Sequence, residues 1–239
     1  MKKRDETALV FRTAGDRGLL VEFGRKVDPE TNAVVRAMVR TLQQTETRGI
    51  VEIVPSYHSL LVIYDPVFIQ PCELKSTVVE LEARLDKTAV EPGRVVEIPV
   101  CYGGEFGPDI QDIGGSYALC LSDIVRLHSE PEYLIYMVGF TPGFPFLGGL
   151  HKKLFAPRLK TPRLVVPQGS VGIANDQTGM YPVASPGGWR IIGRTPLKLF
   201  APRRKNPFLY RAGDKIRFVP ISKEEFADRK EKEDARWEQ

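Results

Sequence analysis

The chain has 239 residues, of which 42% are apolar, and its 34 basic and 30 acidic side chains leave a formal net charge of +4. This length can bury one large core or two modest ones. The one dense basic run, residues 202–205, favours a solvated loop over a nucleic-acid surface. No apolar run approaches the ~20 residues that span a bilayer, and none follows the charged N-terminus as a secretion signal requires. We therefore expect a soluble, cytoplasmic protein.

The sequence lacks the common motifs of self-sufficient catalysis. It has no HExxH, CxxC, GxSxG, GxGxxG or GxxxxGK[ST] segment, so the usual zinc, hydrolase and P-loop chemistries have no support. Its three cysteines have no metal-type spacing and are expected to be reduced thiols. We predict no metal site.

Residues 1–90 alternate strand and helix signals. Strands are predicted at residues 9–12, 19–23, 50–54 and 60–64, the first two forming a hairpin. Asp28 offers an N-cap with Pro29 behind it, and apolar residues at helical spacing then predict a helix through Leu42. Residues 74–85 predict a second amphipathic helix. The order ββαββα predicts a small α+β domain with an open sheet covered by two helices.

A polar turn at residues 89–94 predicts a domain boundary. Beyond it, alternating strand and helix signals give way mainly to short strands. Within residues 94–221, short strands are predicted at 95–100, 133–138, 163–166, 171–174, 179–183, 190–192, 197–200 and 215–219. Closely spaced short strands predict a closed or nearly closed barrel, because closure removes exposed edges. Ser122 is predicted to cap a short helix that ends near His128. A capping box at Ser222–Glu225 begins a charged helical tail, residues 222–239, which we expect to be loosely attached.

Glycine and proline are concentrated between residues 139 and 200. These 62 residues hold 10 of the 21 glycines and 8 of the 19 prolines. Pro-Gly pairs favour tight turns, and here they separate aromatic and apolar residues, which excludes a disordered low-complexity tract. We expect rigid loops around a pocket or docking groove.

The phrases in this segment resemble those of one family. GFTPGFPFLGGL at 139–150, VPQGSVGIA at 166–174, QTGMYP at 177–182 and SPGGWRIIGRTPL at 185–197 are similar to the signatures of the KipI/allophanate-hydrolase-subunit-1 family. SYHSLLV at 56–62 and YGGEFGPD at 102–109 are similar to its weaker N-terminal signatures. His58 departs from the arginine expected there, and residues 111–121 look shortened.

The resemblance implies a small α+β domain followed by a mainly-β, cyclophilin-like barrel. Family members include a subunit of bacterial 5-oxoprolinase, which opens 5-oxoproline to glutamate with ATP, and a sporulation histidine-kinase inhibitor. It also implies two partners, a homologue of allophanate hydrolase subunit 2 and a LamB/YcsF-like protein. We expect a subunit that is inactive alone, with ATP bound by the assembled complex. Inhibition of histidine-kinase autophosphorylation is the alternative, and peptidyl-prolyl isomerisation rests on fold analogy alone.

Opening a lactam requires groups aimed at developing oxyanion charge. The predicted catalytic residues are Arg194, Arg163, Gln177, His128 and Glu105. The arginines suit a carboxylate or phosphate, although they could equally brace loop carbonyls. Glu105 and Asp109 share one Gly-rich loop and could be a base or solvated residues, and His128 could cap a helix. The predicted substrate- or partner-binding residues are Phe140, Phe144, Phe146, Ser170, Tyr181, Gly187, Gly188 and Trp189.

Overall fold

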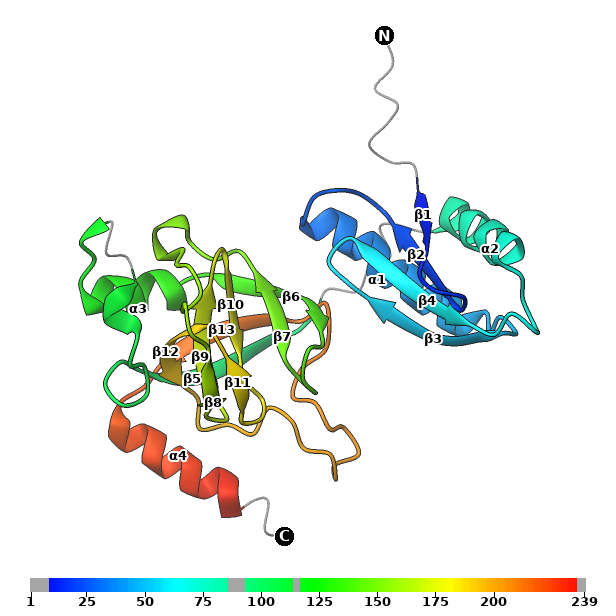
Figure 1. Ribbon diagram of the computed structural model, residues 1–239. Helices are drawn as coiled ribbons and strands as arrows, with labels where there is room; N and C mark the ends of the chain where they lie inside the picture. Colours follow the sequence, from blue (N-terminus) through cyan, green and yellow to red (C-terminus); the bar gives the residue numbers. More distant parts are fainter. Residues whose placement is uncertain (1–8, 86–92, 114–116, 236–239) are drawn as a thin grey trace. The chain divides into compact units, whose positions relative to one another are not determined.

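The computed structural model describes residues 9–85, 93–113 and 117–235. The chain divides into two compact units, Met1–Pro92 and Gly93–Gln239 (Figure 1). Most of the boundary predicted at 89–94 lies outside the described residues. Among the described residues, no helix is long and apolar enough to cross a membrane.

The first unit has the predicted order ββαββα. Its elements are β1 (Val10–Thr13), β2 (Gly18–Glu22), α1 (Pro29–Gln44), β3 (Ile50–Pro55), β4 (Ser59–Tyr64) and α2 (Pro71–Arg84). The strands form one sheet in the order β1-β2-β4-β3, and every neighbouring pair is antiparallel. Both helices are amphipathic, and α1 packs against β3, β4 and α2. The α+β prediction for this part of the chain is therefore confirmed.

Local chemistry fixes the start of α1. The Asp28 carboxylate accepts a hydrogen bond from the Thr31 backbone N–H at 2.8 Å, and Pro29 occupies the first helical position. This N-cap satisfies a backbone donor that the helix itself cannot. The helix then buries Val35, Met38 and Leu42 against Leu60 and other residues of the sheet, forming the core of the first unit.

The second unit is built on a closed barrel, as the strand spacing predicted. The strands lie around it in the order β10-β7-β6-β13-β5-β12-β9, and β9 pairs with β10 to close it. They are β5 (Val95–Tyr102), β6 (Glu132–Val138), β7 (Pro145–Gly148), β9 (Ser170–Ala174), β10 (Gln177–Met180), β12 (Arg190–Arg194) and β13 (Lys215–Pro220). The first and last of these along the chain, β5 and β13, pair in parallel.

The barrel interior is an apolar core. Ile98, Ile135, Val171, Ile192 and Phe218 are among its fully or almost fully buried residues. These side chains come from five strands, so each strand contributes its inward-facing positions to one interior. The helix α3 (Leu121–Ser129) packs against β13.

A second, smaller layer lies outside the barrel strands. The short strands β8 (Arg163–Val166) and β11 (Ser185–Gly187) form a two-stranded antiparallel sheet. Val166 of β8 is fully buried in a separate cluster with the aromatic residues Phe144, Tyr181 and Trp189. The sheet therefore covers an aromatic core that is distinct from the barrel interior.

Several predicted elements were wrong or missed for identifiable reasons. Residues 197–200 form no strand, and their one β-bridge is an isolated pair between Phe200 and Phe208. This segment is flanked by Pro196 and Pro202. The strand predicted at 179–183 begins and ends earlier, at Gln177 and Met180. The strands β7 and β11 were missed because prolines and glycines occupy them. The N-cap of α3 is Cys120, and Ser122 lies inside the helix.

The helical tail is attached more firmly than expected. Helix α4 (Lys223–Ala235) begins with the predicted capping box, in which Ser222 and Glu225 exchange hydrogen bonds. Its Phe226 is only 9% exposed and lies 4.6 Å from the ring of Phe106, centroid to centroid. The charge of this segment had suggested loose attachment, but one apolar side chain anchors it to the barrel unit.

Candidate functional site

Most of the aromatic residues singled out in the sequence form one cluster. Phe144 is at its centre, with ring centroids 5.6 Å from Tyr181, 5.4 Å from Trp189 and 5.1 Å from Phe146. All three contacts are edge-to-face, the arrangement that aromatic quadrupoles favour. Phe140 joins the cluster through Phe144 at 5.7 Å. The cluster connects the Pro/Gly loop at 139–149 with the segment that follows β11.

Glycines allow this cluster to pack closely. A Cβ at Gly179 would lie 3.0 Å from the Phe144 ring and 3.1 Å from the Trp189 ring. A Cβ at Gly187 would lie 2.3 Å from the Tyr181 hydroxyl oxygen. A side chain at Gly187 would therefore clash with Tyr181, and one at Gly179 would require the two rings to shift by a few tenths of an ångström. Burial raises the pKa of Tyr181, and a backbone hydrogen bond from Trp189 opposes this rise.

Arg163 borders the aromatic cluster and is held by an acid. Its Nη2 lies 2.6 Å from Oδ1 of Asp109, and its Nη1 donates a long hydrogen bond of 3.5 Å to the Trp189 carbonyl. The other carboxylate oxygen of Asp109 accepts the Ile191 backbone N–H at 2.7 Å. Asp109 is almost buried, while 31% of the Arg163 side chain is exposed. The pair fixes the guanidinium and leaves part of it accessible, so Arg163 can both brace the loop and meet an anion.

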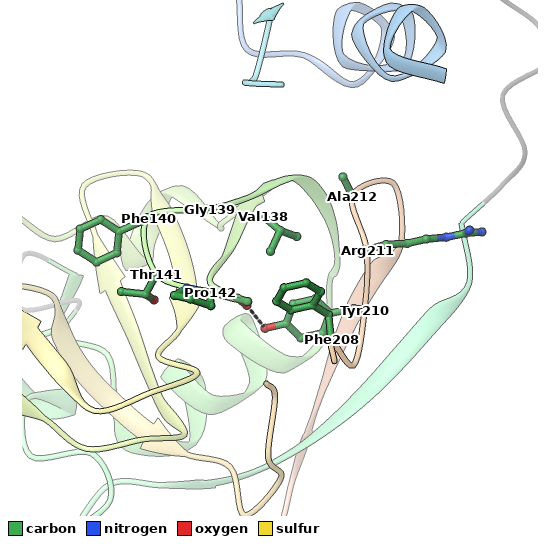
Figure 2. Close-up of a pocket in the computed structure, with 10 residues that line it drawn as sticks. Val138, Gly139, Phe140, Thr141, Pro142, Phe208, Tyr210, Arg211 and Ala212 are labelled. Carbon is green, nitrogen blue, oxygen red and sulfur yellow. Dashed lines mark hydrogen bonds between the residues drawn. The ribbon is translucent and has the colours of Figure 1, made fainter. Parts of the chain in front are cut away.

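A surface hollow of about 440 Å³ lies beside the same loop (Figure 2). Two segments form its walls. The first is residues 138–143, and the second contributes Phe208, Tyr210, Arg211 and Ala212. The Tyr210 hydroxyl donates a hydrogen bond to the Gly143 carbonyl at 2.7 Å and so joins the two segments. Phe140, predicted to contact substrate or partner, is 74% exposed at this hollow.

Arg194 and Ser170 lie on neighbouring strands. Arg194 of β12 is opposite Ser170 of β9, and its Nε donates to the Gln168 carbonyl at 2.8 Å. Ser170 is buried. Gln177 begins β10 opposite Ala174. The Gly188 carbonyl accepts the Leu159 backbone N–H at 2.8 Å. The contact of Arg194 is that of a loop brace, and its catalytic role stays a prediction.

His128 is fully buried inside the barrel unit, separate from the aromatic cluster. Its Nδ1 lies 2.7 Å from the Tyr102 hydroxyl and its Nε2 lies 2.8 Å from Oγ1 of Thr178. The Thr178 hydroxyl donates to the Gly172 carbonyl, so it accepts from Nε2–H, and Nδ1 accepts from Tyr102. Burial lowers the pKa of His128 to about 3, so the ring is neutral near pH 7. This geometry is typical of a core residue, and the catalytic role of His128 stays a prediction.

Glu105 is also separate from the cluster. Its carboxylate lies 2.5 Å from Nζ of Lys223 at the start of α4, and both side chains are mostly exposed. The described residues contain no group of three His, Cys, Asp or Glu side chains that could hold a metal ion. Because it pairs with Lys223, Glu105 helps to attach α4. Its role as a base stays a prediction.

Two features of this region were not found from sequence. Thr178, the partner of His128, gave no signal because it sits fifty residues away in an ordinary strand. The side-chain oxygen of Thr141 is buried and has no hydrogen-bond partner among the described residues. Its phrase Gly-Phe-Thr-Pro-Gly was noted, but a missing partner is visible only in three dimensions.

The aromatic cluster, the Arg163–Asp109 pair and most of the hollow's lining fall within the part of the chain that matches a known family. Residues 9–210 match the family model described as the carboxyltransferase domain, subdomains C and D. The chain belongs to this family. The family resemblance inferred from the motifs is thereby confirmed.

The relatives extend over most of the chain. A 5-oxoprolinase subunit of Bacillus subtilis (strain 168) is 40% identical over 227 residues, covering 91% of this chain and 95% of that protein. Its namesake in Haemophilus influenzae is 45% identical and covers 77% of this chain and 84% of the relative. The urea amidolyase of Lachancea kluyveri is 27% identical, and the match covers only 14% of that protein.

A solved structure supports the fold. The crystal structure of TTHA0988 superposes with a TM-score of 0.75 at 37% identity, covering 86% of this chain. The chain spans 40% of that longer protein. The carboxyltransferase subdomain fold therefore occurs both as a chain of this size and within a larger one.

Proposed function

We propose that this chain is a subunit of an ATP-dependent 5-oxoprolinase, which opens 5-oxoproline to L-glutamate. One observation carries the proposal: two relatives named as 5-oxoprolinase subunits are 40% and 45% identical over most of this chain. The urea amidolyase match is weaker, at 27%, and covers a small part of that protein. The comparison therefore favours a lactam over urea or allophanate as substrate.

The proposed enzyme works only as a complex. A lactam carbonyl is a poor electrophile, and phosphorylation of its oxygen by ATP would activate it. The chain carries no P-loop, so we place the nucleotide in the assembled complex, with a subunit-2-like protein and a LamB/YcsF-like protein as partners. The partly exposed Arg163, held by Asp109, is suited to anionic oxygen on the substrate or its phosphorylated form.

Reconstitution tests the proposal. The chain is co-expressed with its two proposed partners, and glutamate release from 5-oxoproline is followed with and without ATP. We expect ATP-dependent release that is lost when this chain is omitted, and negligible release by this chain alone. Arg163→Ala should lower turnover of the complex by at least about tenfold, the rate equivalent of one charged contact. Arg217→Ala, which removes an exposed partner of Glu97, is the matched control.

Two results would contradict the proposal. Steady turnover by the chain alone would remove the requirement for partners, and no release from a well-formed complex would remove the activity. The second result would favour the regulatory alternative, inhibition of a histidine kinase. One observation is compatible with that alternative: Phe140, Leu164 and Val165 are large apolar side chains that are 74%, 87% and 65% exposed. Such exposure is typical of protein-binding surfaces.

A further inference from the structure

Charge is distributed unevenly along this chain. Residues 133–213 hold 12 of the 34 basic side chains but only 1 of the 30 acidic ones, Asp176. The whole chain is nearly balanced, so this segment is strongly basic and the remainder carries an acidic excess. The basic residues come from several loops of the second unit, so the separation of charge is not the property of one solvated loop.

One of these loops lies against the aromatic cluster. The Leu159 backbone N–H donates to the Gly188 carbonyl at 2.8 Å, which places residues 157–163 beside the turn that follows β11. Arg163, at the end of this loop, reaches the Trp189 carbonyl through Nη1. The loop therefore carries its basic side chains along the border of the cluster.

A second basic loop, residues 200–208, borders the same cluster. Its two ends are joined by the rings of Phe200 and Phe208, which stack with centroids 5.2 Å apart. A Cβ at Gly143 would lie 3.2 Å from the Phe200 Cβ and 3.4 Å from the Phe208 ring. Gly143 precedes Phe144, the centre of the aromatic cluster, so this loop also lies next to the Pro/Gly loop.

Several basic side chains of these two loops lack an acidic partner. Arg163 and its neighbour Arg190 pair with Asp109 and Asp112. In the part of the chain that the structure describes, no carboxylate lies within ion-pair distance of four exposed side chains: Arg158, Lys160, Arg203 and Lys205. Their charge is therefore available to anionic groups on another molecule.

Exposed apolar side chains lie among these charges. Of the described residues after 133, all the exposed large apolar ones fall in the basic segment: Phe140, Phe155, Leu164, Val165 and Phe208. Leu164 and Val165 directly follow the first loop, and Figure 2 shows Phe140 and Phe208 along the hollow. We call the surface of residues 157–165, the loop 200–208 and Phe140 the basic face. Aromatic residues and arginine, which it combines, are enriched in protein interfaces.

The composition of the basic face restricts what can bind to it. A second copy of the chain would place like charges opposite each other. Nucleic acid would give Leu164 and Val165 little apolar contact, because its protein interfaces are more polar than those between proteins. An acidic protein surface that includes apolar side chains suits both components. The same fold also makes up 40% of the TTHA0988 chain, where it is joined to further polypeptide.

We propose that the basic face docks a partner protein through a surface of Asp and Glu side chains surrounding an apolar centre. The charges steer the partner into place, and the apolar side chains hold it there. The partner is a subunit of the proposed complex, so its identity rests on the proposed function.

Binding kinetics of the full chain on its two immobilised partners, at about 0.05 M and about 0.5 M salt, test the assignment. The double variant Arg158→Glu and Lys160→Glu should slow association at least about tenfold at low salt, and less at high salt, because salt screens the steering charges. Leu164→Ala should instead raise the dissociation rate about tenfold.

The matched controls change exposed side chains of the first unit. The double variant Arg25→Glu and Lys26→Glu reverses the same number of charges, and Val67→Ala shortens an exposed apolar side chain. Both should leave the two rates unchanged. The melting temperature of every variant should equal that of the wild type, because all the substituted side chains are exposed.

The outcomes separate this assignment from the proposed function. Assembly that depends on Arg158, Lys160 and Leu164 supports the assignment, even if the complex releases no glutamate. An active complex whose assembly is unaffected by these variants would overturn it, and so would failure to bind either partner at low salt. Binding of the chain to polyuridylate or to phosphatidylserine vesicles through these residues, with assembly unaffected, would also overturn it.

Discussion

His128 illustrates how a titratable residue can be structural. Its position near a predicted helix end favours a cap or core role over catalysis. The structure buries it between Tyr102 and Thr178, and its ring stacks on Phe218 with centroids 4.5 Å apart. The neutral ring satisfies both of its nitrogens, whereas protonation would bury a charge and would require the Tyr102 hydroxyl to become the acceptor.

This burial predicts a pH dependence of stability. The pKa of His128 is about 3 in the folded chain and about 6.5 in an unfolded one. The unfolded state therefore binds a proton first as the pH falls, and the free energy of unfolding decreases between pH 6.5 and 3. The slope should approach about 1.4 kcal/mol per pH unit from this residue. Urea unfolding of the wild type and of His128→Gln at a series of pH values measures this dependence. Equal slopes of the free energy of unfolding against pH in the two proteins would contradict the prediction.

At the residue scale, the sequence indicated which residues are important better than it indicated which residues contact each other. The aromatic residues Phe144, Tyr181 and Trp189 were singled out together, and they do meet. Their large apolar area on Pro/Gly-rich segments required burial wherever the chain placed them. The partner of Arg163 was not predictable, because Asp109 lies 54 residues away and meets it only in the folded chain.

At the scale of elements, α4 depends on one apolar anchor and several exposed ion pairs. Phe226 packs on Phe106, while Lys223 and Asp234 pair with Glu105 and Lys198. Exposed ion pairs each contribute about 0.2–1 kcal/mol at most and weaken with salt. The phenyl group therefore dominates the attachment of this helix.

Removal of that anchor should expose the strand beneath it. Helix α4 packs against β5, which carries the buried Cys101. Burial, with Glu224 and Glu105 next in effect, raises the pKa of the Cys101 thiol and so slows its reaction. In a chain with Cys72→Ser and Cys120→Ser, Phe226→Ala should increase the rate of thiol labelling at least about tenfold, more so in high salt. Phe155→Ala is the control, and an unchanged rate would show that the anchor does not hold α4.

Strands and helices with strong periodicity were predictable, whereas the short strands β7 and β11, made largely of proline and glycine, were not. The first unit has the predicted order because its apolar spacing matches its local structure throughout. The strand β7 begins at Pro145 and ends at Gly148, residues that disfavour strands in isolation. Its pairing with β6 and β10 supplies the stability that local propensity does not.

At the scale of the whole molecule, the described residues form separate cores. The buried cluster of the first unit shares no residue with the barrel core or the aromatic cluster. We therefore expect each unit to unfold on its own, without a single two-state transition for the chain.

Spectroscopy can distinguish the two units. Both tryptophans, Trp189 and Trp237, lie after residue 93, so fluorescence excited selectively at tryptophan reports the second unit alone. Far-ultraviolet circular dichroism reports both units. We expect the two signals to change at different urea concentrations, and coincident curves would show that the units unfold together.

The parallel pairing of β5 with β13 has a consequence for synthesis of the chain. Val95 is opposite Lys215 and Val100 is opposite Pro220, so the first and last strands of the barrel along the chain lie side by side. A ribosome adds about 5–20 residues per second, and about 120 residues separate the start of β5 from the start of β13, its parallel partner. During that interval β5 exposes an apolar strand edge that another nascent chain could pair with. The barrel can therefore close only after β13 has been synthesised, and until then the edge of β5 stays open to pairing with other chains.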